Sequence, residues 1–525
     1  MSMAAQTSPR SRTAGIAAIG PRIRADKLTP MSCPAFIRRL LLVLACIVFE
    51  GGGAFASFAS TPQDDAASAA RRRTVALAAA RSAAQPAAAE AAREFARWSW
   101  KRDLYREEAT AYENVLTFEP DDPVARKAAG YVKKGGAWTR PAGYKPRPNG
   151  PAADAAGLVE RRNAAYAGYR DALLPVVADD AGWDLAGIKA RGEVLDDLVR
   201  FLPNDAAVRA ACGEIREGDR WLLEETPAAR LRRAEIKRLA AAAVKDVPTP
   251  AAAETSAEED AAGADFKAVL RTPLVRIAAS TDAAEAAHVL KACHASIALF
   301  SAIFGATEAK QGLSGFVFAP ADAPKFLAGH PAVDDAARKS SAKMSGMWIK
   351  GRPHFVEFSS DADRRVDGAS RQVLGHLLGR RFGLRSDRGA LFEGAGGHLT
   401  WLVLGTRFTS FVRPTSYDRD SRDPLHERIR KSGADLFAEA AAVLARDDAP
   451  RFENILRVDV NGLDAASFVC GYAFVAYLIE ANPKAFEPVV AGIAEGRLPE
   501  EVLATVLRTT PDRLARRLAR FLSER

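Results

Sequence analysis

An imidazole and a carboxylate stand seventeen residues apart in residues 372–404, which read QVLGHLLGRRFGLRSDRGALFEGAGGHLTWLVL. The imidazole belongs to His376, and the carboxylate belongs to Glu393, which is followed by Gly394. Histidine nitrogens and carboxylate oxygens are groups with which proteins hold catalytic zinc. A catalytic site needs three protein ligands and an open position for water. The stretch therefore supplies two plausible zinc ligands and lacks a third.

The same stretch is predicted to form two consecutive helices. The first carries His376, and the second opens on Glu393 and continues along an apolar face. This layout resembles the active-site helix pair of gluzincin-type zinc metallopeptidases, in particular the peptidase-MA-like family. In that family the first helix carries His-Glu-x-x-His, and the second carries a Glu-Gly pair whose Glu is the third zinc ligand. The resemblance implies a zincin-like domain over residues 265–525, roughly half the chain.

The residues at the motif positions depart from the family pattern. The five positions from His376 read His, Leu, Leu, Gly and Arg, so Leu377 replaces the general base and Arg380 replaces the second histidine. Leu377 cannot accept a proton, and Arg380 offers hydrogen-bond donors only. The sequence therefore predicts a degenerate site of His376, Arg380 and Glu393 without catalysis and without a bound metal. We expect an Arg380–Glu393 ion pair to fill the vacated position, because guanidinium and carboxylate match in geometry.

Three alternatives stay open. The chain is an active zinc metallopeptidase with a non-standard ligand set of His376 and Glu393, completed by His398 or the distant His354. Against His398, five residues at about 100° per residue place it about 140° around the helix from Glu393. Alternatively, His376 is a buried histidine bonded to a neighbour. Alternatively, Glu393 is a carboxylate at a helix start, where the helix dipole favours it.

The elements around the stretch follow the same resemblance. Residues 274–277 alternate like a strand, Thr281-Asp282-x-x-Glu285 can cap a helix that stops at Gly305, and residues 313–319 and 354–358 are predicted as further short strands. This is the order of the N-terminal half of a zincin, which places a mixed sheet beside the motif helix. Five helices are predicted beyond Trp401, at residues 435–445, 465–480, 484–494, 499–507 and 511–524.

An internal duplication with an offset of 83 residues precedes this domain. Seven positions match: Phe118/Phe201, Pro120/Pro203, Asp122/Asp205, Arg126/Arg209, Gly130/Gly213, Gly135/Gly218 and Trp138/Trp221. Self-similarity at one offset indicates a duplicated unit, and a proline followed by a capping aspartate indicates a helix–turn–helix hairpin. The hairpin resembles a tetratricopeptide (TPR) repeat, so residues 95–244 are expected to form a TPR-like region. Its functional interpretation is a partner-binding groove, and the alternative is a helical spacer.

The N-terminal residues predict export. Residues 1–59 hold a pair of arginines, ten apolar residues at 40–49 and a small-residue cleavage site, which is the pattern of a signal peptide. The start is either Met1 or Met31, and the alternative to cleavage is an uncleaved membrane anchor. We therefore expect an extracytoplasmic protein, periplasmic or secreted, that contacts the membrane only through an uncleaved leader.

Two stretches of biased composition separate the predicted domains. Residues 60–94 are Ala-rich and are predicted as a low-complexity tether, helical in part. Residues 245–264 hold two prolines and an acidic run, and they are predicted as a disordered linker and the clearest domain boundary.

The amino-acid composition limits the classes of function that the chain can have. The 525 residues are 48 % hydrophobic, enough for two to four domains. The net charge is +9, of which the leader contributes +5, and the remaining charges are interspersed, which argues against nucleic-acid binding. The cysteines predict no disulfide framework, and no nucleophile elbow or phosphate-binding loop occurs. Together these features predict a mostly helical α+β protein that binds or scaffolds at the cell envelope. A protein or peptide partner is expected at the repeats or at the degenerate site.

Overall fold

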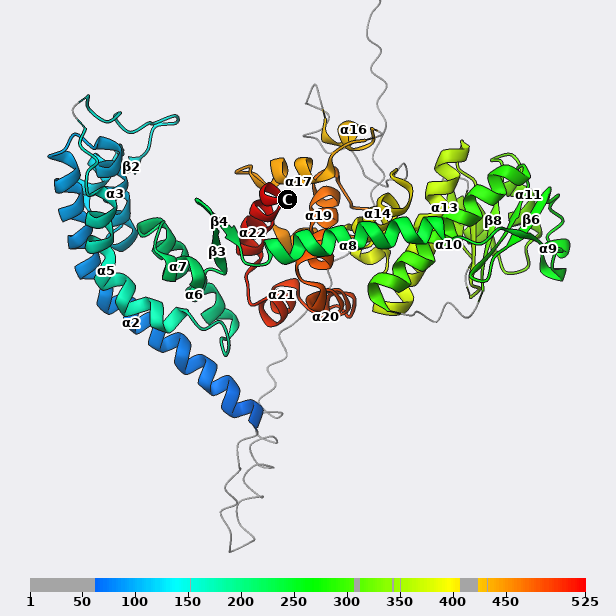
Figure 1. Cartoon of the computed structure of the whole chain (residues 1–525), viewed down its shortest axis with the longest axis horizontal. Coiled ribbons are helices and arrows are strands. Elements are labelled where there is room, and N and C mark those ends of the chain that lie inside the picture. The colour runs from blue at the N-terminus through cyan, green and yellow to red at the C-terminus, as the bar shows by residue number, and fades with distance from the viewer. Residues whose placement is uncertain are drawn as a thin grey trace, which may run out of the picture. The chain divides into compact units, whose positions relative to one another are not determined.

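The computed structural model describes residues 62–151, 153–305, 312–341, 344–349, 351–406, 424–431 and 433–525. The chain divides into two compact units, Met1–Thr61 and Pro62–Arg525, and the described residues belong to the second. The predicted leader therefore lies outside the described residues. The second unit is mostly helical with a small mixed sheet, which confirms the predicted α+β class (Figure 1).

Two copies of one structural unit form the N-terminal part of the described chain. Each copy contains a pair of helices, a short helix and a β-hairpin that was not predicted from the sequence. The first copy comprises α2 (Pro62–Trp100), α3 (Tyr105–Phe118), α4 (Pro123–Ala128), β1 (Val132–Lys134) and β2 (Ala137–Thr139). The second comprises α5 (Leu158–Val177), α6 (Leu185–Phe201), α7 (Ala206–Ala211), β3 (Glu214–Glu217) and β4 (Arg220–Leu223).

The repeated residues have the same roles in both copies. Asp122 and Asp205 cap α4 and α7, and each accepts two backbone N–H groups. Arg126 and Arg209 each donate to the carbonyl of the proline six residues earlier, at 2.6 Å in both copies. Each arginine also lies 5.9 Å from the ring centroid of the tryptophan in its own β-hairpin. The repeat in the sequence is therefore a duplication of structure.

The predicted tether corresponds mostly to α2, which is a packed helix. Arg81 of α2 donates to Asp197 of α6 at 2.9 Å, so the helix is tied to the second copy. Alanine has the highest helix propensity, and its small side chain allows close helix packing. The α2 side chains buried in the core shared with α5 and α6 include Leu77, Ala88, Ala92 and Phe95. The alanine-rich composition thus reflects packing, and the prediction of a tether is corrected.

The predicted disordered linker is ordered. It contains β5 (Ala251–Ala252) and α9 (Ala257–Ala261). Ser256 and Glu259 form a capping box at the start of α9. Glu259 is 1 % exposed and also accepts from Arg276 at 2.6 Å. The acidic residues that suggested disorder are thus partly used in capping and ion pairing, and the prediction is wrong.

The predicted domain boundary also falls inside a packed region. Helix α8 (Thr226–Lys245) precedes it and packs against α10 (Ala283–Phe304) and α19 (Ala465–Ala481). Ala229 and Ile236 of α8 are buried in the large core of the C-terminal half. The C-terminal half therefore begins before residue 265.

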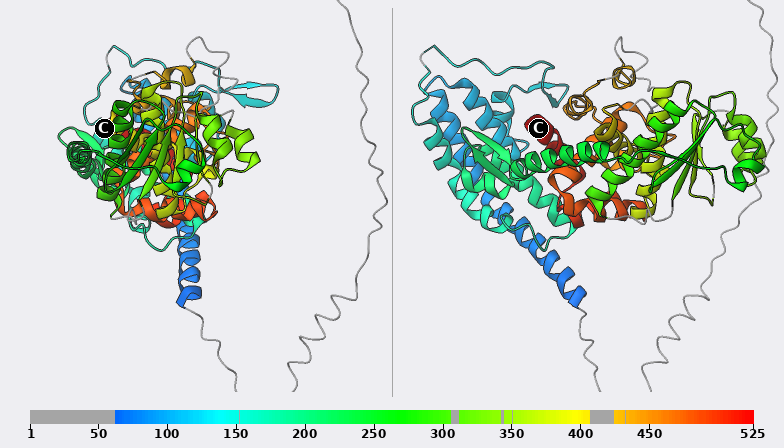
Figure 2. Two further views of the ribbon diagram at one scale, coloured as in Figure 1. Left: turned by 90° about the vertical axis from the view of Figure 1, so that its right-hand side faces the viewer. Right: turned by 45° about the vertical axis from the view of Figure 1, so that its right-hand side comes forward.

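A mixed sheet lies in the C-terminal half (Figure 2). It has six strands in the order β5-β6-β7-β8-β10-β9. The remaining strands are β6 (Ala268–Arg271), β7 (Val275–Ala279), β8 (Leu313–Val317), β9 (Gly346–Trp348) and β10 (His354–Glu357). Strand β8 pairs in parallel with β7 and β10, whereas the edge strand β9 is antiparallel to β10. The three strands predicted from the sequence are confirmed as β7, β8 and β10, and β5, β6 and β9 were missed.

Helices cover both faces of the sheet. On one face, Ile277 and Val317 pack against α10 and α13 (Ala362–Phe382). On the other face, Phe316 packs against α11 (Ala323–Gly329). Among the described residues, α10 is the one helix whose length and composition would allow it to cross a membrane, and most of it is buried in this core. Its burial identifies α10 as a core helix of the domain.

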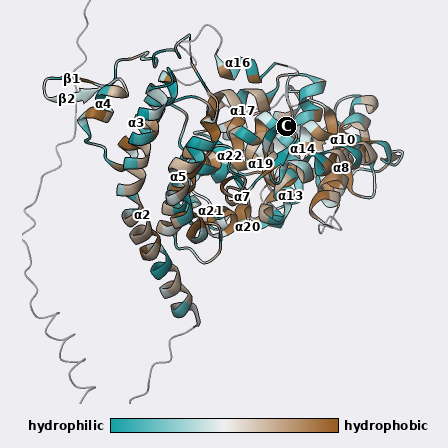
Figure 3. Cartoon of the chain, turned by 60° about the vertical axis from the view of Figure 1, so that its left-hand side comes forward, coloured by the Kyte–Doolittle hydropathy of each residue, from teal (hydrophilic) through white to brown (hydrophobic). Residues whose placement is uncertain are grey.

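The C-terminal helices surround α19. Besides α14 (Gly389–Leu404), they are α16 (Leu425–Ile429), α17 (Leu436–Leu444), α18 (Phe452–Ile455), α20 (Pro483–Ala494), α21 (Pro499–Leu507) and α22 (Pro511–Glu524). The short helices outside these elements are α9, α11, α12 (Asp335–Ser341) and η1 (Ser386–Arg388). The five helices predicted beyond Trp401 are confirmed within about two residues. Brown, hydrophobic residues gather on the helices around α19 in Figure 3, and α19 is buried along most of its length.

Glycines bring α14 and α19 into backbone contact. A Cβ atom at Gly394 would lie 2.7 Å from the carbonyl carbon of Gly471, so neither helix could approach as closely with a larger residue. The close crossing fixes α14, and with it Glu393, relative to the rest of the domain.

The caps of the duplicated unit give a first test. We expect Asp122→Ala to lower the free energy of unfolding by about 1–2 kcal/mol, because α4 loses its N-cap. The adjacent Asp121→Ala is the control, since its side chain is 97 % exposed and pairs only at the surface. Urea unfolding measures both variants, and equal losses would contradict the assigned role of Asp122.

Candidate functional site

The two helices predicted to carry the site are present. Helix α13 (Ala362–Phe382) begins at Asp361, which accepts from the N–H of Arg364, and ends at Gly383 with φ of +69°. Helix α14 begins at Gly389, so Glu393 lies in its second turn. The interpretation of Glu393 as a carboxylate at the helix start is therefore wrong.

Glu393 forms an ion pair with Arg371 of α13, not with Arg380. Both partners are buried, with 3 % exposure for Glu393 and 8 % for Arg371, whereas Arg380 is exposed. Nine residues at about 100° per residue place Arg380 about 180° around α13 from Arg371. The predicted Arg380–Glu393 pair is therefore wrong, because the wrong face of α13 was assigned to α14.

Small residues make room for this pair. Gly375 lies one turn after Arg371 on the face of α13 that meets α14, and a Cβ atom there would lie 2.7 Å from the ring of Phe392. On α14, a Cβ atom at Gly397 would lie 3.3 Å from Nη1 of Arg371. The Arg371 guanidinium thus fits between closely packed helices, where water has little access.

His376 lies on a different face of α13. Its ring stacks on the indole of Trp348 in β9, with 4.3 Å between the centroids and 12° between the planes. One turn earlier, the carbonyl of Gln372 accepts from Nε1 of Trp348 at 3.1 Å. Burial lowers the pKa of His376, and the charge of Arg380 lowers this pKa further, which favours the neutral ring. His376 and Glu393 therefore have partners on different sides of α13.

His398 does not join either group. It is fully buried between aromatic rings, 5.2 Å from the ring of Tyr472 and 6.1 Å from that of Phe437, measured between centroids. These rings belong to α19 and α17, so His398 serves the helix core. The proposed rescue of a zinc site by His398 finds no support in this environment.

A buried carboxyl group that the sequence did not reveal contacts Gln372 of α13, one turn before His376. Glu357 of β10 is 2 % exposed, and burial raises its pKa to about 7. It accepts from the backbone N–H of Ser359 at 3.0 Å and from Nε2 of Gln372 at 2.9 Å. Gly346 and Gly368 border the carboxylate, and a Cβ atom at Gly346 would lie 2.7 Å from it. No sequence signal marked Glu357, because its niche is built from three separate segments.

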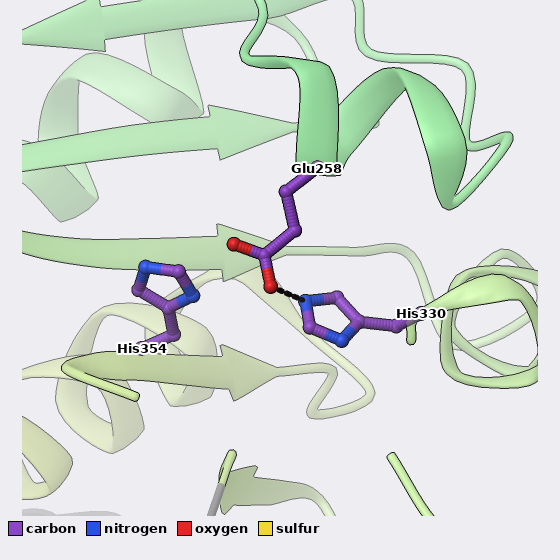
Figure 4. Close-up of side chains that lie close together, drawn as sticks. All are labelled: Glu258, His330 and His354. Carbon is purple, nitrogen blue, oxygen red and sulfur yellow. Dashed lines mark ion pairs between the residues drawn. The ribbon is translucent and has the colours of Figure 1, made fainter. Parts of the chain in front are cut away.

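A second cluster of possible metal ligands brings together Glu258, His330 and His354 (Figure 4). One ligand atom from each residue lies within 4.8 Å of the other two, and Nε2 of His330 is 3.5 Å from Oε1 of Glu258. Burial lowers the pKa of both histidines, which favours neutral rings. His354 was considered from the sequence only as a distant partner of His376. The other two residues were missed, because Glu258 fell in the predicted linker and His330 matched no motif.

No protein-family model matches this sequence, and no curated protein matches it. The assignment of function therefore depends on the geometry of the described residues.

The buried pair gives a second test. We expect Arg371→Met to lower the free energy of unfolding by about 3–5 kcal/mol, because it leaves Glu393 buried without its partner. Adding Glu393→Gln should recover a large part of this loss, because the buried charge is then removed. The control is Arg380→Met, expected within about 0.5 kcal/mol of the wild type. If chemical denaturation shows that Arg380→Met is as costly as Arg371→Met, the pairing is wrong.

Glu357 gives a test by pH. Its pKa is raised from the ordinary 4.5 to about 7, so the folded state holds a proton that the unfolded state has lost between these values. Its contribution must therefore make stability fall as pH rises from 4.5 to 7. Between pH 5 and pH 8, the free energy of unfolding of Glu357→Gln should rise by about 1–3 kcal/mol relative to that of the wild type. Urea unfolding measures this difference. The half-exposed Glu487→Gln is the control, and an equal gain there would refute the assignment.

Proposed function

We propose that this chain is an exported, non-catalytic binding protein whose C-terminal domain resembles zinc metallopeptidases without their chemistry. The observation that carries the proposal is the buried Arg371–Glu393 ion pair. A carboxylate can ligate zinc only with a free lone pair directed at the ion. Here the carboxylate of Glu393 is paired with the guanidinium of Arg371, and both groups are buried. Removing one partner of such a pair costs several kcal/mol, about 3–5.

The remaining motif positions support the same conclusion. Leu377, at the position of the general base in the motif, is buried and apolar and cannot accept a proton. The exposed Arg380 offers donors only, and the indole of Trp348 covers one face of His376. The alternative, an active zinc peptidase using His376 and Glu393, would have to displace Arg371 and turn both ligands toward one point.

The duplicated β-hairpins suggest where a partner binds. In the second copy, residues 214–225 carry five acidic and two basic residues, a net charge of −3. The basic helix α22 packs on this hairpin. Arg517 donates to Glu225 at 2.7 Å, and Arg520 pairs with Glu214 and donates to the carbonyl of Trp221 at 2.5 Å. The hairpin is thus a docking element with charges complementary to the helix that it holds.

The equivalent hairpin of the first copy has the opposite charge. Residues 131–142 carry three basic residues and no acidic residue, a net charge of +3. Strand β1 is exposed along its length, including Val132 at 40 % exposure. The first copy has Thr139 and Arg140 where the second copy has the buried Leu222 and Leu223. Because this hairpin lacks the two leucines, charge must contribute more to binding than apolar contact. The repeat region therefore binds an acidic segment of a protein partner through this hairpin.

Zinc content tests the non-catalytic assignment. We expect His376→Ala to leave the zinc bound by the full chain unchanged, whatever its amount, because His376 takes part in no metal site. Mass spectrometry under native conditions measures the stoichiometry. Loss of one zinc equivalent in His376→Ala, together with loss of a chelator-sensitive peptidase activity, would establish the active alternative.

Charge reversal tests the binding element. The probe is a synthetic peptide with the sequence of α22 in which the four arginines are replaced by glutamates. We expect it to bind the full chain with an affinity that falls as the salt concentration rises. The double variant Lys133→Glu plus Lys134→Glu should bind it about tenfold or more weakly. Lys237→Glu, an exposed lysine on α8, is the control. Equal binding of the unaltered α22 peptide would contradict recognition by charge.

A further inference from the structure

Three segments that are distant in the sequence bring Glu258, His330 and His354 together. Glu258 lies on α9, His330 follows the last residue of α11, and His354 is the first residue of β10. Figure 4 shows the carboxylate of Glu258 between the two imidazole rings, with one nitrogen of each ring directed toward it. Within the described residues, Oε1 of Glu258, Nε2 of His330 and Nδ1 of His354 are buried and make no hydrogen bond.

We propose that Glu258, His330 and His354 form a binding site for a divalent ion of the zinc class. Two imidazole nitrogens and one carboxylate oxygen are a ligand set that zinc accepts, with a fourth position left for water. Three buried polar atoms without hydrogen bonds are costly unless something bridges them, and an ion would satisfy all three at once. The site is separate from His376 and Glu393, so it stands independently of the proposed function.

The fold holds the three ligands in place before an ion arrives. His354 is fixed by the pairing of β10 with β8, where it lies opposite Ser314. The ring of His330 packs against Phe326 at 5.1 Å and Phe316 at 6.1 Å between centroids, and its side chain is fully buried. Helix α9 is held by its capping box and by Glu259, which pairs with Arg276. Ligands fixed by packing lose little freedom on binding, which favours a tight site.

Two neighbouring groups make binding of an ion less favourable. Nε of Arg352 lies 3.5 Å from the same Oε1 of Glu258, where its charge competes with a cation. The Arg352 side chain is 52 % exposed, so it can move into solvent when an ion binds. The backbone N–H of Ala332 donates to Nδ1 of His330 at 3.2 Å. Binding through Nε2 moves the ring proton to Nδ1, so this one hydrogen bond is given up.

Zinc titration of the full chain against a chromophoric chelator tests the site. We expect the wild type to bind one Zn²⁺ here, and Arg352→Gln to bind about threefold or more tightly, because a competing charge is removed. His330→Ala and His354→Ala should weaken binding by about 100-fold or more. Zinc should also raise the melting temperature of the wild type, and His376→Ala should match the wild type in both measurements.

The partly exposed Glu258 provides a variant that keeps the core intact. Glu258→Gln should fold like the wild type by circular dichroism, lose zinc affinity, and show no rise in melting temperature with zinc. Zinc binding that survives His330→Ala, His354→Ala and Glu258→Gln would overturn the proposal. Failure of both the wild type and Arg352→Gln to bind zinc would overturn it as well. Zinc lost in His376→Ala alone would instead refute the non-catalytic assignment.

Discussion

The packing of α13 against α14 depends on one buried ion pair between these two helices. Arg371 of α13 and Glu393 of α14 are both withdrawn from water, where either charge alone would be expensive to bury. Each charge therefore requires the other as its partner. This requirement restricts how α13 packs on α14 to arrangements in which Arg371 and Glu393 meet. The backbone contact of α14 with α19 at Gly394 and Gly471 fixes this arrangement from the other side. The carboxylate that could have ligated a metal is thus part of the structural core.

The orientation of α13 follows from the same pair. With Arg371 directed at α14, His376 lies about 140° away around the helix and meets the sheet edge, where Trp348 stacks on its ring. The residues that resemble a zinc site are therefore divided between two environments. The duplicated units carry hairpins of opposite net charge. The hairpin of the second copy holds α22 of this chain.

Local signals in the sequence predicted the elements well. Asp282 and Gly305 mark the ends of α10, and three of the five predicted C-terminal helices, α20, α21 and α22, begin with a proline. The duplication was visible because capping and turn residues are set by local backbone geometry. These features involve residues close together in the sequence, so one sequence is enough to find them.

The partners of individual side chains could not be predicted in the same way. Arg371 and Arg380 are both arginines on one helix, and only the tertiary packing decides which of them meets Glu393. The niche of Glu357 and the cluster around His330 join segments that fold together without any shared motif. Amino-acid composition gave wrong predictions in two places. The alanines of α2 suggested a tether but pack in a helical core, and the acidic residues near Glu259 suggested disorder but contribute to helix capping.

The most direct measurement is anomalous X-ray scattering at the zinc edge from crystals of the full chain soaked in a zinc salt. We expect no zinc peak beside His376 and electron density for the Arg371 guanidinium against the carboxylate of Glu393. A zinc ion coordinated by His376 and Glu393, with Arg371 displaced, would contradict it.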